Sequence, residues 1–184
     1  GSRKVSIACE AFAPLVPQIN GIKMINADSP NGIRVTGCSF QNSGAKTGIT
    51  AIYIFNPSGS SVGSRITNNI ITDTEDGIHD KTIYSSEITG NYIFNTTNSA
   101  IWLQNEDTPD AGAGNISWNT MACTTTCAYG LLWNGPGAVR YINNTQNGFT
   151  EQIRLAPAGT TSQIHILAND LDGGANTTYG IRWT

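Results

Sequence analysis

One six-residue phrase recurs along the chain and decides the fold. It consists of an aliphatic residue, two mostly small or polar residues, an asparagine, a variable residue and a second aliphatic residue. Its clearest copies are Ile66-Thr67-Asn68-Asn69-Ile70-Ile71, Ile88-Thr89-Gly90-Asn91-Tyr92-Ile93 and Ile116-Ser117-Trp118-Asn119-Thr120-Met121. Weaker copies begin at Val35, Tyr141 and Ile166, so the shared position falls at 38, 69, 91, 119, 144 and 169. Self-similarity at such spacings is the signature of a repeat architecture.

A second phrase follows each copy of the first after a turn of variable length. It usually consists of a small residue, an aliphatic residue, a variable residue and an apolar residue, and its copies begin at Ala51, Gly77, Ala100, Gly130, Gln152 and Gly180. Each repeat therefore holds at least two short strands with a two-residue period. Repeats this short leave no room for a crossover helix. We predict an all-β solenoid of about six to seven irregular coils, whereas a β-sandwich would require neither a fixed asparagine nor two phrases.

The repeats also suggest how the chain is organised. Residues 20–184 are expected to form one solenoid domain, and residues 1–19 a possible N-terminal cap. The opening Gly1-Ser2, without a methionine, is typical of a cloning scar, so we expect a fragment of a longer protein.

Composition narrows the function classes. Charged residues make up 12% of the chain, against roughly 25% in an average domain, and Asn, Thr, Ser and Gly take their place. A net charge of -3 with scattered basic residues argues against a nucleic-acid partner. No apolar run approaches the roughly 20 residues of a membrane helix, so we expect no membrane insertion. We expect no metal site and no cofactor, because no ligand spacing is present.

The asparagines have a structural interpretation. If successive coils stack in register, Asn69, Asn91, Asn119, Asn144 and Asn169 share one bend, where their amides bind one another or the backbone. Asparagine also tolerates the left-handed backbone of a sharp bend. Cys123 and Cys127 could close a small loop by a disulfide, but we expect free thiols buried as small hydrophobes.

Together, the two phrases and the irregular coil length resemble the right-handed parallel β-helix family, whose fold is pectate-lyase-like. Within it, coils rich in Asn, Thr, Ser and Gly with few charges are most similar to the shaft of a bacteriophage tailspike or surface adhesin. The resemblance implies a homotrimer in a virion tail or outside the cell, which binds and often cleaves bacterial surface polysaccharide.

A candidate binding surface comes from the second phrase. Its outward position gives the column Tyr53, His79, Trp102, Leu132, Arg154 and Arg182. Aromatic rings stack on sugar faces, and Arg and His bind hydroxyl, carboxylate or sulfate groups. We therefore predict that Tyr53, His79, Trp102, Arg154 and Arg182 bind ligand, with residues 55–64 and 104–114 forming walls. The alternative is that these are ordinary solvent-facing strand residues.

Candidate catalytic residues are the carboxylates near this column, namely Asp76, Asp80 and Glu106. Glycoside hydrolysis needs two carboxyl groups about 5 to 9.5 Å apart, and adjacent coils would bring Asp80 near Glu106. A lyase would need a base, for which Lys81 and Arg154 are the local candidates. An alternative interpretation is that the acidic residues cap turns and keep a solenoid soluble. Two further functions therefore stay open: a secreted polysaccharide lyase or glycoside hydrolase, and a passive structural shaft.

Overall fold

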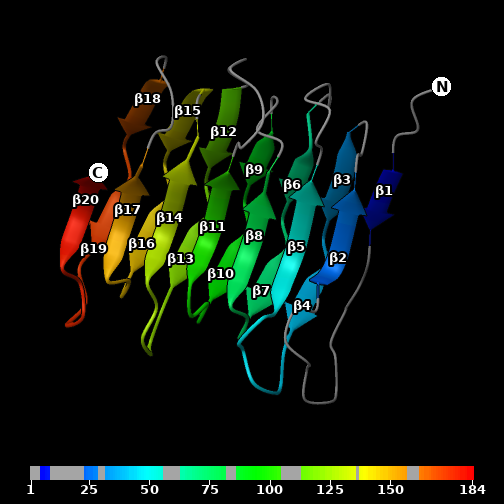
Figure 1. The fold of residues 1–184 in the computed structure, drawn as a ribbon, viewed down its shortest axis with the longest axis horizontal. Coiled ribbons are helices and arrows are strands. Elements are labelled where there is room, and N and C mark those ends of the chain that lie inside the picture. Colours follow the sequence, from blue (N-terminus) through cyan, green and yellow to red (C-terminus); the bar gives the residue numbers. More distant parts are fainter. Residues whose placement is uncertain are drawn as a thin grey trace.

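The computed structural model describes residues 5–8, 23–28, 32–55, 63–81, 86–104, 113–135, 137–156 and 162–184. Within these ranges the regular structure consists of β-strands, and every strand pair is parallel. The strands form three sheets, which we call A, B and C, and all three run the length of the molecule. Sheet C, whose strands are given below, lies nearest the viewer in Figure 1. The predicted all-β parallel solenoid is thus confirmed.

Each coil visits the three sheets in the same order. Sheet A contains β1 (Val5–Ala8), β3 (Ile33–Thr36), β6 (Arg65–Thr67), β9 (Glu87–Thr89), β12 (Ala113–Ser117), β15 (Gly137–Ile142) and β18 (Ser162–Leu167). Sheet B contains β4 (Ser39–Gln41), β7 (Ile70–Thr72), β10 (Tyr92–Phe94), β13 (Thr120–Ala122), β16 (Thr145–Asn147) and β19 (Asp170–Asp172). Sheet C contains β2 (Lys23–Asp28), β5 (Thr50–Phe55), β8 (Asp76–Asp80), β11 (Ser99–Gln104), β14 (Tyr129–Asn134), β17 (Glu151–Leu155) and β20 (Tyr179–Trp183).

The coil count differs slightly from the prediction. The chain makes about five full turns, from β3 to β18, rather than six to seven. Each coil also holds three strands, because the first phrase bends in its middle. Ile66 lies in β6 of sheet A, whereas Ile71 lies in β7 of sheet B, and both are buried.

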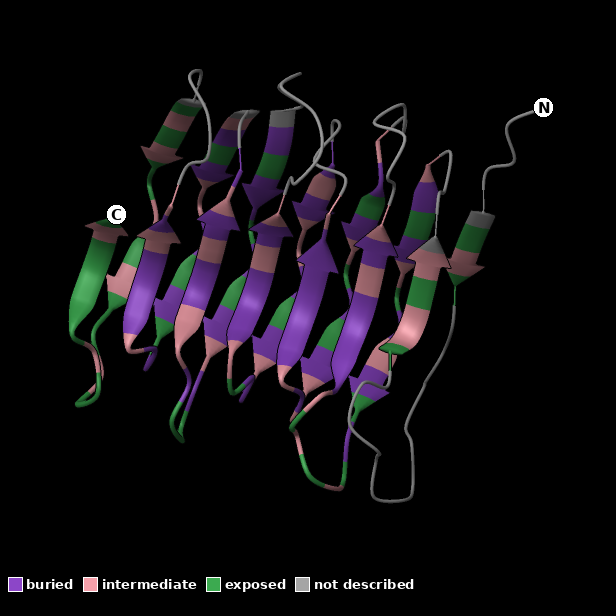
Figure 2. Cartoon of the chain, viewed as in Figure 1, coloured by how far each residue is buried: buried purple, intermediate pink, exposed green. Residues whose placement is uncertain are grey.

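The core is built from stacked aliphatic side chains. Ile66, Ile88 and Ile116 pair in register along sheet A, and all three are fully buried. Sheet C adds a second row, Ile52, Ile78, Ile101, Leu131 and Ile153. Burial of each such side chain stabilises the fold by about 1.5–3 kcal/mol. In Figure 2 the row is purple through the middle coils, whereas β20 is largely green, since Ile181 is 50% exposed.

The small residue of the second phrase also points inward. A Cβ atom on Gly77 would lie 2.5 Å from the Ala100 carbonyl oxygen and 2.9 Å from Ile93 Cγ2, a core atom. Gly77 and Ile78 therefore both face the interior, and the register skips the small residue in each coil. As a consequence, the residue before the small residue and the residue two positions after it, such as Asp76 and His79, share the outer face of sheet C.

The predicted asparagine ladder is present at the bend between sheets A and B. Asn119 typifies its members: its Nδ2 donates to the Ile88 carbonyl and to Asn144 Oδ1, both at 2.9 Å. Its Oδ1 accepts from the backbone N–H of Asn91 at 3.0 Å and from Asn91 Nδ2 at 2.9 Å. The same bonds link Asn69, Asn91, Asn119, Asn144 and Asn169. Because the first four amides are buried and that of Asn169 is half-buried, and all are bonded, the ladder sets the register of the coils.

The left-handed residue of this bend is not the ladder asparagine, which corrects the prediction. Positive φ angles occur one position earlier, at Gly37, Asn68, Gly90, Trp118, Asn143 and Ala168. The ladder residue keeps an ordinary backbone and uses its side chain for hydrogen bonding. Gly and Asn suit the left-handed position, whereas Trp118 does not.

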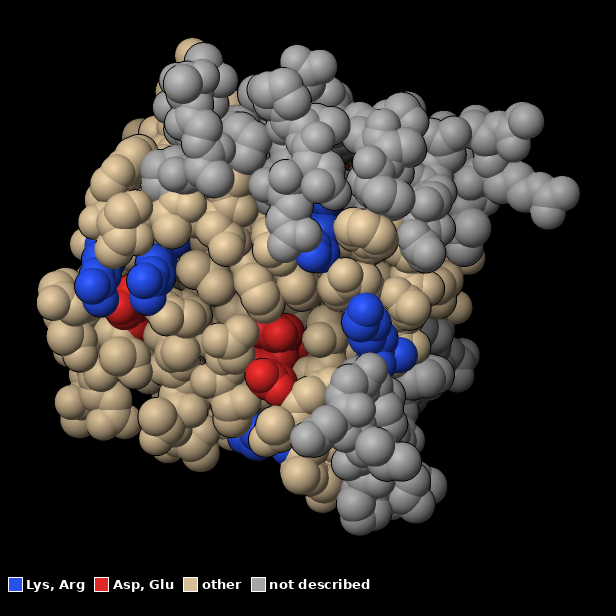
Figure 3. All heavy atoms as spheres, viewed as in Figure 1, with Lys and Arg blue, Asp and Glu red and all other residues tan. Residues whose placement is uncertain are grey.

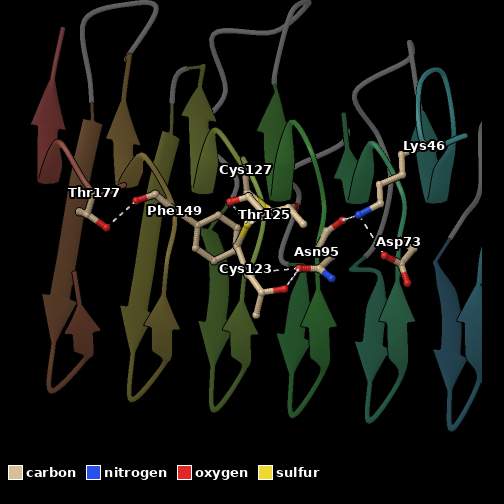
Figure 4. Close-up of a disulfide and its surroundings, with 9 residues drawn as sticks. Lys46, Asp73, Asn95, Cys123, Thr125, Cys127, Phe149 and Thr177 are labelled. Atoms are coloured by element: carbon tan, nitrogen blue, oxygen red, sulfur yellow. Dashed lines mark hydrogen bonds and ion pairs between the residues drawn. A yellow bond between two sulfur atoms is a disulfide. The ribbon is translucent and has the colours of Figure 1, made fainter. Parts of the chain in front are cut away.

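The expectation of free thiols is wrong. Cys123 and Cys127 form a disulfide that closes the turn between β13 and β14, and Cys38 is disulfide-bonded as well. Figure 4 shows the Phe149 ring beside this disulfide. Neighbouring turns are joined to it through Asn95, whose Oδ1 accepts from the Thr124 N–H at 2.9 Å and whose carbonyl accepts from Lys46 Nζ at 3.0 Å. Lys46 also pairs with Asp73 at 2.9 Å.

Candidate functional site: the outer face of sheet C

The predicted outward column exists as one in-register row on sheet C. Tyr53, His79, Trp102, Leu132, Arg154 and Arg182 are consecutive partners across β5, β8, β11, β14, β17 and β20. A second row lies three residues earlier on each strand and comprises Thr50, Asp76, Ser99, Tyr129, Glu151 and Tyr179. Together the two rows place aromatic, basic, acidic and hydroxyl side chains on one face of sheet C.

In the aromatic half of the column, the side chains pack against one another. The rings of His79 and Trp102 stack with centroids 3.9 Å apart and planes inclined by 8°. Tyr53 meets His79 edge-on at 5.1 Å, and Lys23 Nζ lies 3.3 Å from the Tyr53 centroid. The faces of His79 and Trp102 therefore cover each other along the solenoid axis, and Tyr53 packs against His79 with the two ring planes nearly perpendicular. A sugar stacking on an open ring face, as the sequence suggested, would have to displace one of these contacts.

Hydrogen bonds hold these rings in place. Trp102 Nε1 donates to Asn134 Oδ1 at 2.6 Å, and His79 Nε2 lies 3.0 Å from Gln104 Oε1. His79 is buried and Trp102 is half-buried. This half of the face is consequently rigid and offers amide groups and ring edges to a ligand.

The C-terminal half of the face carries a charged cluster in which the two arginine side chains are partly exposed and the glutamate between them is buried. Arg182 Nη1 donates to Glu151 Oε1 at 2.8 Å, and Arg154 Nε lies 3.9 Å from Glu151 Oε2. Arg154 Nη1 also donates to the Tyr129 hydroxyl at 2.8 Å, and the Arg182 guanidinium lies 5.0 Å from the Tyr179 ring centroid. Figure 3 shows the two basic side chains over β17 and β20 with acidic atoms between them.

One atom of this cluster is ion-paired but makes no hydrogen bond within the described part of the chain. Glu151 Oε2 is buried and accepts no hydrogen bond from the described residues. A buried carboxylate oxygen without a donor is costly, and this one lies on a sheet face beside two guanidinium groups. It would accept a hydroxyl group from a bound molecule once a neighbouring guanidinium group moves aside.

The predicted catalytic carboxylates do not come together. Asp80 is fully buried, pairs in register with Ile54 and Leu103 of the core, and accepts from Ser86 Oγ at 2.6 Å. It therefore points away from the outer face. Glu106, and most of the two loops expected to form walls, lie outside the described residues.

Asp76 alone of the three lies in the outer rows. Its Oδ1 accepts from Asn98 Nδ2 at 2.8 Å and from Ser99 Oγ at 2.5 Å. Burial raises the pKa of this carboxyl above its usual value despite those hydrogen bonds, and the neighbouring Glu75 raises it further. A carboxyl that holds its proton to higher pH can donate it.

Sequence reasoning missed Trp118. It sits in the left-handed position with φ 59° and is 65% exposed, beside a surface groove of about 290 Å³. The available signal was its place in the first phrase, where the other copies have Gly, Asn or Ala. A side chain of that size interrupts the pattern and points outward.

The described residues contain neither a metal-binding cluster nor a membrane-spanning helix. Among them, no group of His, Cys, Asp or Glu is arranged to hold a metal ion. Nor does that part of the chain contain a helix long and apolar enough to cross a bilayer.

In comparisons with protein-family models, with curated proteins and with solved structures, nothing matches this chain.

Proposed function

We propose that the outer face of sheet C binds an extended polysaccharide, with the cluster around Glu151 as its anchor. The observation that carries the proposal is Glu151 Oε2, which accepts no hydrogen bond from the described residues and is paired only with Arg154 Nε at 3.9 Å, next to Arg182. Sugar hydroxyls donate to carboxylates and accept from guanidinium groups, so one saccharide unit satisfies both. The half-exposed Tyr179 ring supplies a face on which such a unit can rest.

The flat in-register rows support a ligand that extends along the solenoid axis. From the Glu151 cluster such a chain would follow the column toward Trp102, His79 and Tyr53, where it would contact ring edges and the Gln104 and Asn134 amides. The proposed ligand is a bacterial surface polysaccharide, as in the tailspike-like β-helices that the phrases resemble. A disulfide in the turn after β13 supports a location outside the cell, since such bonds persist in oxidising compartments.

The proposal is tested by titrating the protein with purified capsular and lipopolysaccharide glycans. We expect Arg182→Ala and Glu151→Gln each to weaken binding about tenfold, the effect of losing one charge-assisted hydrogen bond. Trp102→Ala should weaken it less and leave the protein folded. The matched control is Arg65→Ala, which removes an exposed arginine paired with Glu87 on sheet A. Equal losses in the control and in Arg182→Ala would refute a site on sheet C.

Cleavage of the bound glycan is a second proposed function, favoured by the raised pKa of the Asp76 carboxyl on the same face. A protonated carboxyl is the general acid that glycoside hydrolysis requires. Asp76→Asn keeps the acceptor oxygen for Asn98 and Ser99 but cannot give up a proton. The variant should bind glycan normally and release no reducing ends. Normal turnover by this variant would exclude Asp76 as the acid.

A further inference from the structure

A groove at the bend between sheets A and B forms a second candidate binding site, behind sheet C in the view of Figure 1. It spans three coils and has a volume of about 290 Å³. Its lining comprises the Trp118 side chain, the small Ala168 and the polar residues Thr120, Asn143, Thr145 and Asp170. No residue of the Glu151 cluster or of the aromatic column takes part in it.

The backbone under Trp118 is the first observation that marks this groove. Trp118 holds φ 59° at a bend where Gly37, Asn68, Gly90 and Asn143 occupy the equivalent positions. A bulky residue with positive φ is a genuine outlier, and such outliers cluster at ligand sites. The bend does not need the indole, because neighbouring coils form the same bend without one.

The polar lining is the second observation. Thr120, Thr145 and Asp170 are partner residues or next neighbours along sheet B, and all three are exposed. In the described part of the chain, no group hydrogen-bonds the side chain of Asn143, Thr145 or Asp170. An amide, a hydroxyl and a carboxylate are therefore available together beside one indole that is 65% exposed.

We propose that this groove binds a saccharide unit whose ring stacks on the Trp118 indole. The C–H face of a pyranose packs on an aromatic face, and its ring hydroxyls bind polar groups at the rim. Asn143 donates and accepts, Thr145 does both, and Asp170 accepts, which matches the mixed character of sugar hydroxyls. The polar rim favours a saccharide over an apolar protein surface, which would leave these groups without partners.

The site is independent of the one on sheet C. Because the two lie on different faces, one chain would hold glycan at two places, and binding at one would raise the effective concentration at the other. A failure of the sheet C proposal leaves this inference intact, and the variants below separate the two.

The test uses the full chain and hexasaccharides of glucose, mannose, galactose and N-acetylglucosamine, measured by calorimetry and by saturation-transfer NMR. The informative variant is Trp118→Asn, since Asn68 and Asn143 occupy the same bend in other coils and the fold is expected to persist. We expect at least one hexasaccharide to bind the unaltered chain and the variant to lose about tenfold in affinity. Asp170→Asn and Thr145→Val should each lose a smaller factor.

Two controls make the result specific. Ile70→Thr removes another exposed apolar side chain from the same sheet face and places there the residue found at 120 and 145, so affinity should not change. Arg65→Ala, on sheet A and outside both proposed sites, should also leave hexasaccharide affinity unchanged. Failure of all four hexasaccharides to bind, or equal affinity in Trp118→Asn, overturns the proposal. So does self-association of the chain that Trp118→Asn abolishes, because that result assigns the groove to a protein interface.

Discussion

Replacement of Asn119 by alanine tests whether the asparagine ladder holds the coils together. The change removes two bonds donated by Nδ2, to the Ile88 carbonyl and to Asn144. It also removes two accepted by Oδ1, from the Asn91 backbone N–H and the Asn91 side chain. Asn119 is 1% exposed, so water does not replace these partners without opening the bend.

The expected cost follows from the groups left behind. The Asn91 N–H and the Ile88 carbonyl each lose the Asn119 side chain as a buried partner, at about 1–3 kcal/mol per unsatisfied group. The sum is about 2–6 kcal/mol, which is a large part of the roughly 5–15 kcal/mol by which domains are stable. We therefore expect the free energy of unfolding to fall by about 4 kcal/mol, the middle of that range.

Urea unfolding followed by circular dichroism measures this change, and hydrogen exchange of the Asn91 amide locates it. The matched control is Asn68→Gly, which removes an exposed amide one position before the ladder and keeps a residue suited to positive φ. It should cost less than about 0.5 kcal/mol. If Asn119→Ala unfolds at the same urea concentration as this control, the ladder does not stabilise the coils and the reasoning fails.

Three further outcomes are expected. Replacing Cys123 and Cys127 together by serine should lower the free energy of unfolding by about 2 kcal/mol, the loop-closure entropy for a separation of 4 residues; no change on reduction would show that the turn is held by its hydrogen bonds alone. Because the pKa of Asp76 is raised in the folded state, its contribution to stability is complete below pH 3.8 and is lost as pH rises through the folded value. Asp76→Asn should therefore be more stable than the parent at pH 7 and equal to it at low pH, as thermal unfolding across pH will show; a pH-independent difference contradicts the linkage. If the chain assembles as the tailspike-like resemblance implies, light scattering should give three times the 19.6 kDa chain mass, and a monomer mass at micromolar concentration would argue against a trimer.

The asparagine ladder and the outward column could be predicted because each coil of a solenoid has the same structural requirements as its neighbours. A buried asparagine that satisfies the neighbouring coil is needed once per turn, so Asn69, Asn91 and Asn119 recur at one place in the phrase. A two-residue period likewise fixed which side chains point outward, and His79 and Trp102 are partners as expected. Such features can be predicted from the sequence repeat and from the alternation of side chains between the two faces of a strand.

The features that escaped prediction depend on individual side-chain contacts and backbone angles that the repeat does not specify. The same parity that turns His79 outward turns Asp80 inward, and Asp80 is accommodated there through Ser86, which lies six residues further along the chain. The mutual stacking of His79 and Trp102 depends on side-chain torsions that a strand pattern does not fix. At the bend, Gly37, Gly90 and the asparagines at 68 and 143 signalled the left-handed position, but Trp118 and Ala168 obscured it.

The ladder also has a direction. The backbone groups of each bend are satisfied by the asparagine of the following coil: Asn69 binds Cys38 N–H and the Val35 carbonyl, and Asn169 binds Asn144 N–H and the Tyr141 carbonyl. During synthesis from the N-terminus, a coil therefore keeps an open bend until the next coil leaves the ribosome and closes it. The newest coil serves as a template whose exposed N–H and carbonyl select an incoming asparagine. Folding of this chain is thus expected to proceed one coil behind translation, with each turn locked by its successor.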